Sequence, residues 1–537
     1  MKKWISLLLA LTLTAGMLGG CGKKKEEEAY VPTGDAIVMS DADLATIPDE
    51  REPQSVTLAY DPSRSLHPLI GNDLSNRVVM SLLYQGLFAT DSNNEPHPIL
   101  CSHYQVSSDN RTYTYYIDKK ATFSDGSPVT GEDVMATYEY ARDKSSYYKG
   151  RFFHVLSMEQ VHDDSLGEDG IRFVLSTAYQ DFSMLQTIPI LKASQLEEDF
   201  PLGTGPYVLK QETSKATLLR NSSWWCNVET PVRADIVNLV PVSSQSDLRD
   251  EFEFGDVSIA VANPLSDSFA EYSCDYELWN NDSGYFMYLG VNVTYSDYFK
   301  DERNMALRHA LTYALDRETI IENNFRGKAY AATLPASPGS PYYNESLAER
   351  YAYDDLKFLD AISGFEPIKD EKMNIKKMRL LVNVDDSARL RTARNIAATL
   401  TNMGIPCGTL EYGSHTDYSY EDLLRSHNWD LYLGKTRLSP NMDMSPFFKG
   451  YGSLFFGGLT SDELYAMCKE TLADRGNYYN LHKLVAEDGR IVPLLFGYDA
   501  VYAKRGVFDG LSPSRDNVFF YTIGKTMSEI QIKTVYN

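Results

Sequence analysis

The side chains that most often perform covalent chemistry in proteins are present in this sequence, but their spacing forms no known catalytic pattern. Nine histidines are scattered from His67 to His482, and neither an HExxH nor a GxSxG segment occurs. With 74 acidic residues in a chain of 537, close pairs of carboxylates arise by chance, so they indicate no general acid–base site. We therefore expect no enzyme activity.

The cysteines and the glycine-rich segments also fail to define a site. No CxxC pair occurs, so neither a zinc site nor a thioredoxin-like redox pair is indicated. Gly203 and Gly205 precede a predicted strand, whereas the glycines of a phosphate-binding loop follow a strand and open a helix. We expect these two glycines to supply backbone freedom. The sequence predicts no cofactor and no directly bound metal. The six cysteines are Cys21, Cys101, Cys226, Cys274, Cys407 and Cys468.

The composition indicates a large acidic protein that does not bind nucleic acid. A hydrophobic content of 43% allows a chain of this length to bury a large core in two or three lobes. The net charge of −23 and a sequence pI near 4.9 exclude nucleic-acid binding, which needs clustered Lys and Arg. The 37 tyrosines and five tryptophans combine an apolar face with a polar tip, which suits a binding cleft.

The N-terminus has the features of an export signal. Lys2 and Lys3 precede an apolar run from Trp4 to Leu18, and Gly19-Gly20-Cys21 follows it. This arrangement resembles the bacterial lipoprotein signal, in which the cysteine receives lipid, including palmitate, and becomes the new N-terminus. We therefore expect residues 1–20 to be a signal peptide and Cys21 to be lipidated. An ordinary cleaved signal with an incidental cysteine is the alternative.

Residues 21–54 are polar and carry little apolar periodicity. They begin with a run of lysines and glutamates and contain Pro32, Gly34, Pro48 and Pro53. Such a segment cannot bury enough apolar surface to order itself, so we expect a disordered tether. No later stretch approaches 18 consecutive apolar residues, so we expect membrane attachment only through the lipid.

Strand-like and helix-like patterns alternate along the rest of the chain and predict a mixed α/β fold. Thr130, three residues before Asp133, predicts a capping box, and Gly404 predicts a helix stop. The expected strands are 55–60, 113–117, 378–384 and 429–433, and the expected helices are 76–87, 131–142, 304–314, 317–321 and 388–403.

Five segments, taken in order, resemble the extracellular solute-binding proteins of family 5, which are the oligopeptide, dipeptide and nickel-chelate receptors of ABC importers. The resemblance covers nearly all of residues 55–530. The segments are Ser65-Leu66-His67-Pro68-Leu69, Tyr84-Gln85-Gly86-Leu87, the run from Phe123 to Val134, Gly203-Thr204-Gly205-Pro206-Tyr207, and the run from Arg308 to Arg317.

The resemblance implies a two-lobed periplasmic-binding-protein-like fold of type II, similar to cluster C, with a hinge. The first lobe would comprise residues 55–75, 196–285 and 488–537, and the second lobe 286–487. An extra small domain of the peptide-binding-protein type would comprise 76–195.

The resemblance also implies a function. A monomer would capture a peptide or other small solute in the cleft between the lobes and deliver it by hinge closure to permease subunits and their ATPases. It would lie on the extracytoplasmic face of the cell membrane, in the periplasm if the cell has an outer membrane. The alternatives are a receptor of this fold used for sensing, or one for a non-peptide solute such as a metal chelate or a sugar.

The ligand-binding residues are expected partly where the sequence departs from the family. Peptide receptors of the family supply an aspartate to the ligand ammonium, and Ser439 stands at that position here. Arg437 nearby raises the hypothesis of an anionic ligand group held bidentately, the alternative being a salt bridge within the protein. Asn441 is a further candidate, and Asp443 would need a local shift to bind an ammonium. Tyr60, Asp61 and Asn72 follow the first strand, where family ligands often touch the first lobe, and packing roles are the alternative.

Overall fold

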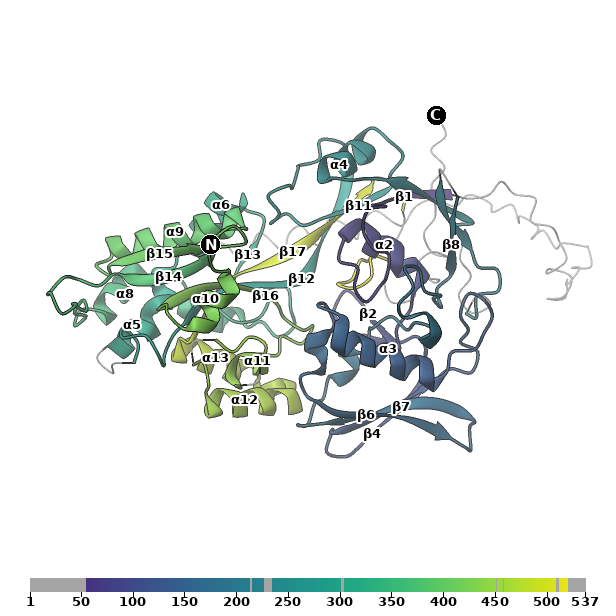
Figure 1. Cartoon of the computed structure of the whole chain (residues 1–537), viewed down its shortest axis with the longest axis horizontal. Helices are drawn as coiled ribbons and strands as arrows, with labels where there is room; N and C mark the ends of the chain where they lie inside the picture. The colour runs from purple at the N-terminus through teal and green to yellow at the C-terminus, as the bar shows by residue number, and fades with distance from the viewer. Residues whose placement is uncertain are drawn as a thin grey trace, which may run out of the picture. The chain divides into compact units, whose positions relative to one another are not determined.

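The computed structural model describes residues 55–212, 215–226, 234–300, 304–450, 452–456, 458–508 and 511–519 (Figure 1). These described residues belong to one compact unit. Cys21, the predicted signal peptide and the predicted tether lie outside the described residues. Among the described residues, no helix has the length and apolar character that crossing a bilayer requires.

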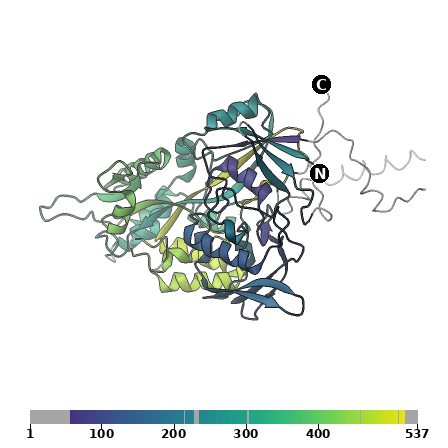
Figure 2. The ribbon, with the colours of Figure 1, turned by 45° about the vertical axis from the view of Figure 1, so that its right-hand side comes forward.

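One 11-stranded sheet extends through both lobes. Its order is β15-β14-β16-β12-β17-β11-β1-β10-β9-β8, with β13 also paired to β17. The two longest strands, β12 (Tyr276–Val291) and β17 (Ile491–Lys504), pair antiparallel at its centre and pass from one lobe to the other (Figures 1 and 2). Their pairing shifts register between Asp282 and Phe286, so the sheet is irregular where it crosses. These strands are the connection that a hinge motion would bend.

The first lobe is built around β1 (Ser55–Tyr60), which pairs in parallel with β10 (Ile236–Pro241) and β11 (Ile259–Ala262). The antiparallel strands β9 (Ala216–Arg220) and β8 (Tyr207–Gln211) extend the sheet. Helices α2 (Leu74–Leu83) and α4 (Gln245–Glu253) pack beside β1 and β11. We therefore describe α2 with the first lobe, although the expected boundary at residue 76 put most of it in the extra domain.

Helix α2 ends four residues before the predicted end at Leu87, because Tyr84 is extended with a φ of −129°. A Cβ at Gly203 would lie 2.1 Å from the carbonyl oxygen of Leu83, and one at Gly205 would lie 2.5 Å from that of Leu82. A side chain at either position would therefore collide with the end of α2, which explains both glycines. We had expected them to supply backbone freedom instead.

The extra domain is a four-stranded antiparallel sheet of order β4-β5-β7-β6 with α3 packed on it (Figure 1). The strands are β4 (Cys101–Val106), β5 (Thr112–Ile117), β6 (Val155–Asp163) and β7 (Glu168–Leu175), and a small hairpin joins β2 (Phe88–Thr90) to β3 (Pro96–Pro98). Helix α3 (Gly131–Lys144) begins with the predicted capping box of Thr130 and Asp133. Short 3-10 turns follow at Lys149–Phe152, Phe182–Leu185 and Ala193–Gln195.

The second lobe contains the predicted parallel β-α-β unit. Strand β14 (Met378–Asn383) pairs in parallel with β15 (Cys407–Tyr412) and β16 (Leu431–Arg437), and α9 (Ser387–Asn402) covers β14 and β15. The strand predicted at 429–433 begins two residues later, at Leu431, and continues to Arg437.

The remaining elements of this lobe are mostly short helices. The helix predicted over 304–314 divides into α5 (Met305–Ala310) and a 3-10 turn, Leu311–Ala314, whereas α6 (Arg317–Phe325) runs past its predicted end. The others are α7 (Glu345–Ala348), α8 (Asp355–Ala361), α10 (Tyr420–Ser426), α11 (Ser445–Phe448), α12 (Asp462–Ala473), α13 (Tyr478–Asp488), strand β13 (Tyr330–Ala331), and 3-10 turns at Glu349–Tyr351 and Arg475–Asn477.

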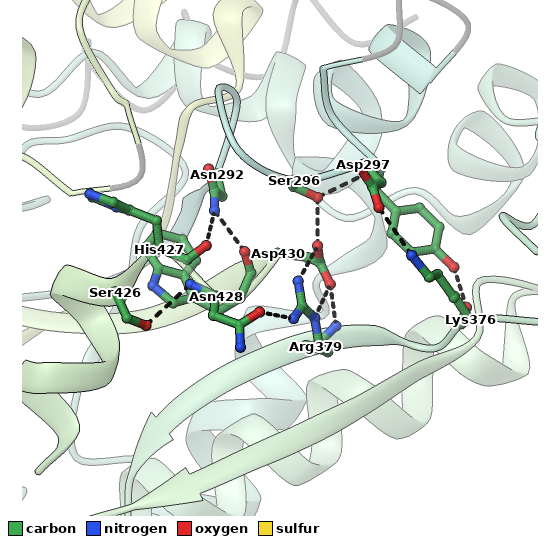
Figure 3. A network of polar contacts seen from close by, with 11 residues as sticks. Asn292, Ser296, Asp297, Lys376, Arg379, Ser426, His427, Asn428 and Asp430 are labelled. Atoms are coloured by element: carbon green, nitrogen blue, oxygen red, sulfur yellow. Dashed lines mark hydrogen bonds and ion pairs between the residues drawn. The ribbon is translucent and has the colours of Figure 1, made fainter. Parts of the chain in front are cut away.

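A buried polar network fixes the end of the second lobe where β16 begins (Figure 3). The carboxylate of Asp430 accepts hydrogen bonds from Ser296 Oγ at 2.6 Å and from the backbone N and Nε of Arg379 at 2.8 and 3.0 Å. Asn292 donates to the carbonyl oxygen of Trp429 at 2.7 Å. Because this network satisfies its buried carboxylate internally, it has a structural role.

Candidate functional site

A cavity of about 790 Å³ lies between the two lobes and the extra domain. The first lobe contributes Asn72, Leu74, Arg77, Asn263 and Asp499. The extra domain contributes residues of α3 and the turn after it, and the second lobe contributes the end of β16 and the loop that follows it. A molecule bound here would therefore touch all three parts of the fold. Tyr285 lines the cavity from β12. The lining residues of the extra domain and the second lobe are Arg142, Ser146, Tyr147, Lys149, Gly150, Arg151, Phe152, Phe153, Thr436, Arg437, Leu438, Ser439, Asp443, Pro446, Ser453 and Leu454.

Arg437 occupies the last position of β16, opposite Tyr285 in β12. Its guanidinium carbon lies 4.7 Å from the ring centroid of Tyr285 and 4.7 Å from that of Tyr147 of the extra domain. Two aromatic rings therefore hold the cation by cation–π contacts. Nη2 lies 3.8 Å from Asp499, and within the described residues Nε has no hydrogen-bond partner.

Asp499 lies on β17, and its side chain is 14% exposed. Burial raises the pKa of its carboxyl group, although the guanidinium groups of Arg437, Arg77 and Arg515 oppose that shift. In the part of the chain that the structure describes, Oδ1 of Asp499 accepts no hydrogen bond. The cavity wall thus carries a cation and an anion that face one another without a direct hydrogen bond.

A second carboxylate, Asp516, does not line the cavity but binds two side chains that do, Tyr147 and Arg151. It accepts hydrogen bonds from Tyr147 Oη at 2.6 Å, Thr187 Oγ1 at 2.8 Å and Arg151 Nη2 at 3.0 Å, and Arg77 lies 3.6 Å away. Burial alone would raise the pKa of Asp516, but these two guanidinium groups outweigh burial and hold the pKa well below its usual range.

The loop after β16 forms a buried contact with the extra domain. His154 Nε2 lies 3.1 Å from Asp443 Oδ2, and Asn441 Nδ2 donates to Tyr179 Oη at 2.7 Å. Ser439 Oγ donates to Asn441 Oδ1 at 2.8 Å. Burial opposes ionisation of Asp443, but His154 and the hydrogen bonds from Ser445 lower the pKa of that carboxyl. Asp443 is therefore already engaged within the protein.

The structure brings together three of the residues that the sequence proposed for ligand binding. Asn72, Arg437 and Ser439 line the cavity. Asn441 is buried behind it against Tyr179, and Asp61 closes a turn by accepting from Ser63 N at 2.8 Å and Ser63 Oγ at 2.6 Å. Tyr60, at the end of β1, packs against the core of the first lobe. The ligand roles of these residues stay predictions.

Sequence reasoning missed most of the lining, including Tyr147, Arg151, Tyr285 and Asp499. One signal was available for Asp499, which is the only acidic residue in the otherwise apolar run from Ile491 to Ala503. A buried strand tolerates such a charge only with a partner or a function. Nothing local marks the others, because they meet through the folding of distant segments.

The described part of the chain contains no group of three or more His, Cys, Asp or Glu side chains arranged to hold a metal ion. Cys101, Cys407 and Cys468 are buried free thiols, and burial raises the pKa of each. These thiols lie in the core rather than in the cavity wall.

Two lobes joined by continuous strands, with a cavity between them, define the class of two-lobed periplasmic binding proteins. Solved structures of that class share the fold. A substrate-binding protein of an ABC transporter, CtaP from Listeria monocytogenes, superposes with a TM-score of 0.68 over 90% of this chain and 100% of that one at 18% identity. AppA, the oligopeptide-binding protein of Bacillus subtilis solved with a nonapeptide, gives 0.61 over 90% and 100% at 19% identity.

The sequence profile of the bacterial extracellular solute-binding proteins, family 5 (middle region) matches residues 95–455. The chain belongs to this family. A curated relative, the glutathione-binding protein GsiB of Escherichia coli strain K12, is 24% identical over 302 residues, which are 55% of this chain. The match spans 57% of the length of that relative.

Proposed function

We propose that this chain is the substrate-binding component of an ABC importer, which captures a peptide or a similar small solute and delivers it to a permease. The observation that carries the proposal is the 790 Å³ cavity with walls from both lobes and the extra domain. A volume of this size suits a small ligand. Family membership and the names of the relatives, which bind glutathione and a nonapeptide, support the same function.

The proposed mechanism is hinge closure around the solute. A ligand that touches both lobes stabilises the closed arrangement by its differential affinity for that arrangement. Strands β12 and β17 carry the bending, and the contacts of His154 with Asp443 and of Tyr179 with Asn441 form when the second lobe reaches the extra domain. The permease and its ATPases would then recognise the closed form. No catalytic step is part of this proposal.

The ligand is bound without the aspartate that peptide receptors of the family use for the ammonium group. Ser439, which the resemblance puts at that position, lines the cavity, and a serine hydroxyl cannot supply a charge-assisted hydrogen bond to a buried ammonium. Peptide binding therefore requires another arrangement of charges, which the cavity offers in Arg437 and Asp499.

Native mass spectrometry of the full-length chain, extracted in detergent and compared before and after denaturation, tests the proposed function. We expect release of a small solute of defined mass, and a peptide would identify a peptide importer. A chain that carries no solute and binds none from a metabolite extract would contradict the proposal.

We also propose that Cys21 is lipidated and holds the chain on the extracytoplasmic face of the membrane. Metabolic labelling with palmitate tests this point directly. The wild-type chain should take up label and sediment with membranes, and Cys21→Ala should do neither. Labelled Cys21→Ala protein would place the lipid elsewhere.

A further inference from the structure

A short segment of the first lobe contacts the second lobe beside the two strands that join the lobes. Residues 263–271 lie between β11 and β12, so the chain enters this segment from the first lobe and returns to that lobe. The segment is called the strap below. Its first residue, Asn263, lines the cavity, and Phe269 near its end is buried in the core of the first lobe. The residues between them contact the second lobe.

Leu265 fixes the strap on the second lobe by apolar packing. Its side chain is 7% exposed and belongs to the core of that lobe, together with Met287 and Leu495. A Cβ at Gly497 would lie 2.5 Å from Leu265 Cδ1, so the leucine lies directly against β17. Gly497 is in the stretch where the pairing of β17 with β12 shifts register. Leu265 therefore packs on the part of the central strands that a hinge motion would bend.

Asp267 adds a polar contact between the strap and helix α9. Its carboxylate accepts hydrogen bonds from Ser387 Oγ at 2.7 Å and from the backbone N of Ser387 at 3.4 Å. Ser387 is the first residue of α9, where the backbone N–H groups have no acceptor within the helix and the helix dipole favours a negative charge. A carboxylate of the first lobe thus binds the N-terminus of a helix of the second lobe.

The end of the strap contacts a further helix of the second lobe. Arg326, directly after α6, donates from Nη1 to the carbonyl oxygen of Phe269 at 3.4 Å, and its guanidinium carbon lies 5.9 Å from the ring centroid of Phe269. Lys328 Nζ lies 3.8 Å from Glu271. The strap therefore contacts the second lobe at the central strands, at α9 and after α6.

We infer that the strap is a further, non-covalent connection between the lobes, which seats on the second lobe when that lobe touches the extra domain and leaves it as the lobes separate. Because both ends of the strap belong to the first lobe whereas Leu265 and Asp267 bind the second, rotation between the lobes strains or breaks these contacts. Contacts that exist in one arrangement stabilise that arrangement.

The strap links lobe closure to the wall of the solute cavity. A seated strap fixes the position of Asn263, so Leu265 and Asp267 are positioning residues that act on solute binding through closure. This inference rests on the proposed function, because it requires lobes that move against one another.

Hydrogen exchange of the full-length chain in detergent, without added solute, tests the inference. The reporter is the amide of Gln180 in the extra domain, which donates to the carbonyl oxygen of Leu472 in α12 at 2.7 Å and is freed when the lobes separate. Asp267→Asn should speed this exchange about 2- to 5-fold, because an exposed charge contributes little. Leu265→Ala should speed it about 10-fold or more, because a buried leucine contributes more.

Matched variants separate the role of the strap from a general loss of stability. Leu248→Ala removes a buried leucine of α4 from the core of the first lobe, and Asp250→Asn removes an exposed carboxylate of the same helix that pairs with Arg249. Both controls should leave exchange at Gln180 unchanged. Wild-type exchange at Gln180 in both strap variants, or an equal increase in the controls, would overturn the inference.

The opposite substitution gives the second arm, because coupling between two contacts is reciprocal. Arg475→Ala removes a contact with Asp181 of the extra domain and should speed exchange of the amides of Leu265 and Ser387, whose hydrogen bonds are accepted by strap side chains. If these two amides kept their wild-type exchange while Gln180 exchanged faster, the strap would stay seated in the open arrangement and the inference would be wrong. Neither arm uses a solute, so the result is independent of the co-purification test.

Discussion

At the scale of single residues, Asp516 is a buried carboxylate that holds two cavity-lining side chains in place. It joins Tyr147 and Arg151 of the extra domain to the C-terminal segment, and its side chain is only 10% exposed. Removing one member of a buried ion pair leaves the other without a counter-ion.

Asp516→Asn should therefore lower the free energy of unfolding by about 3–5 kcal/mol. Denaturant titration followed by tryptophan fluorescence measures this loss. Asp275→Asn is the matched control, because Asp275 makes a similar pair with Arg505 at 3.0 Å but is exposed, and exposed pairs contribute about 1 kcal/mol or less. Equal losses in the two variants would show that burial does not control the effect.

The same carboxylate predicts a dependence on pH. Because the folded protein holds the pKa of Asp516 below its value in the unfolded chain, the stabilisation is complete above about pH 4, the ordinary carboxyl pKa. It is lost as the pH falls below that value. The difference in stability between wild type and Asp516→Asn should thus be constant from pH 5 to pH 7 and shrink in acid. A difference that grew in acid would contradict the direction of the pKa shift.

The spatial partners of the charged residues in the cavity could not be predicted from the sequence. Arg437 could be proposed because it lies beside a departure from the family pattern. Its partners could not, since Tyr147 and Asp499 are 290 and 62 positions away in the sequence and meet Arg437 only in the fold. The surroundings of Arg437 in the cavity depend on these long-range contacts.

At the scale of secondary structure, Gly284 lies in the stretch of β12 where its pairing with β17 shifts register between the lobes. Its φ is +68°, and a Cβ there would lie 1.9 Å from Nη2 of Arg515 and 2.8 Å from the carbonyl oxygen of Leu438. The glycine therefore leaves room for Arg515 to pass the strand that joins the lobes.

Gly284→Ala should destabilise the protein by more than the cost of a positive φ alone, which is about 1–2 kcal/mol. Gly126→Ala is the control, because Gly126 has a φ of +82° but nothing lies within 4 Å of its Cβ position. Thermal unfolding of both variants measures the difference. Equal midpoints would mean that Arg515 moves aside without cost.

Elements with local signals could be predicted well. The capping box of Thr130 and the stop at Gly404 depend on neighbouring residues, and α3 and α9 begin and end close to the predicted positions. The predicted end of α2 and the predicted start of β16 were wrong by four and two residues. At α2, the close approach of Gly203 to Leu83 is a tertiary contact that no local signal reveals.

At the scale of the whole molecule, Arg475 connects the second lobe to the extra domain at the edge of the cavity region. Its Nε lies 2.7 Å from both carboxylate oxygens of Asp181, and Nη1 lies 3.2 Å from Glu95 (Figure 2 shows the two parts side by side). The backbone N of Gln180 also donates to the carbonyl oxygen of Leu472 at 2.7 Å, so a main-chain contact adds to the side-chain contacts there.

Arg475→Ala should favour the open arrangement and increase the radius of gyration of the solute-free chain in small-angle X-ray scattering. Arg505→Ala removes the same charge from a pair within the first lobe and should leave the radius unchanged. Identical scattering from both variants would show that other contacts hold the lobes together.

The family and the α/β class could be predicted from ordered motifs, since these motifs encode turns, caps and core positions. The cleft could not, because its walls come from segments hundreds of residues apart. The sequence therefore identified the architecture, whereas the chemistry of the cavity became visible only in the structure.

The central strand pair has a consequence for how such proteins diversify. The chain leaves the first lobe along β12 and returns along β17, and Gly290 pairs with Ile491 across that boundary. The entry and exit of the second lobe are thus neighbours, as in an inserted domain. A recombination event that exchanged the residues between them would replace one wall of the cavity as a single cassette. The exchange would leave the opposite wall unchanged, because it lies outside the exchanged segment. The unchanged residues would include Arg77, Tyr147, Asp499 and Asp516.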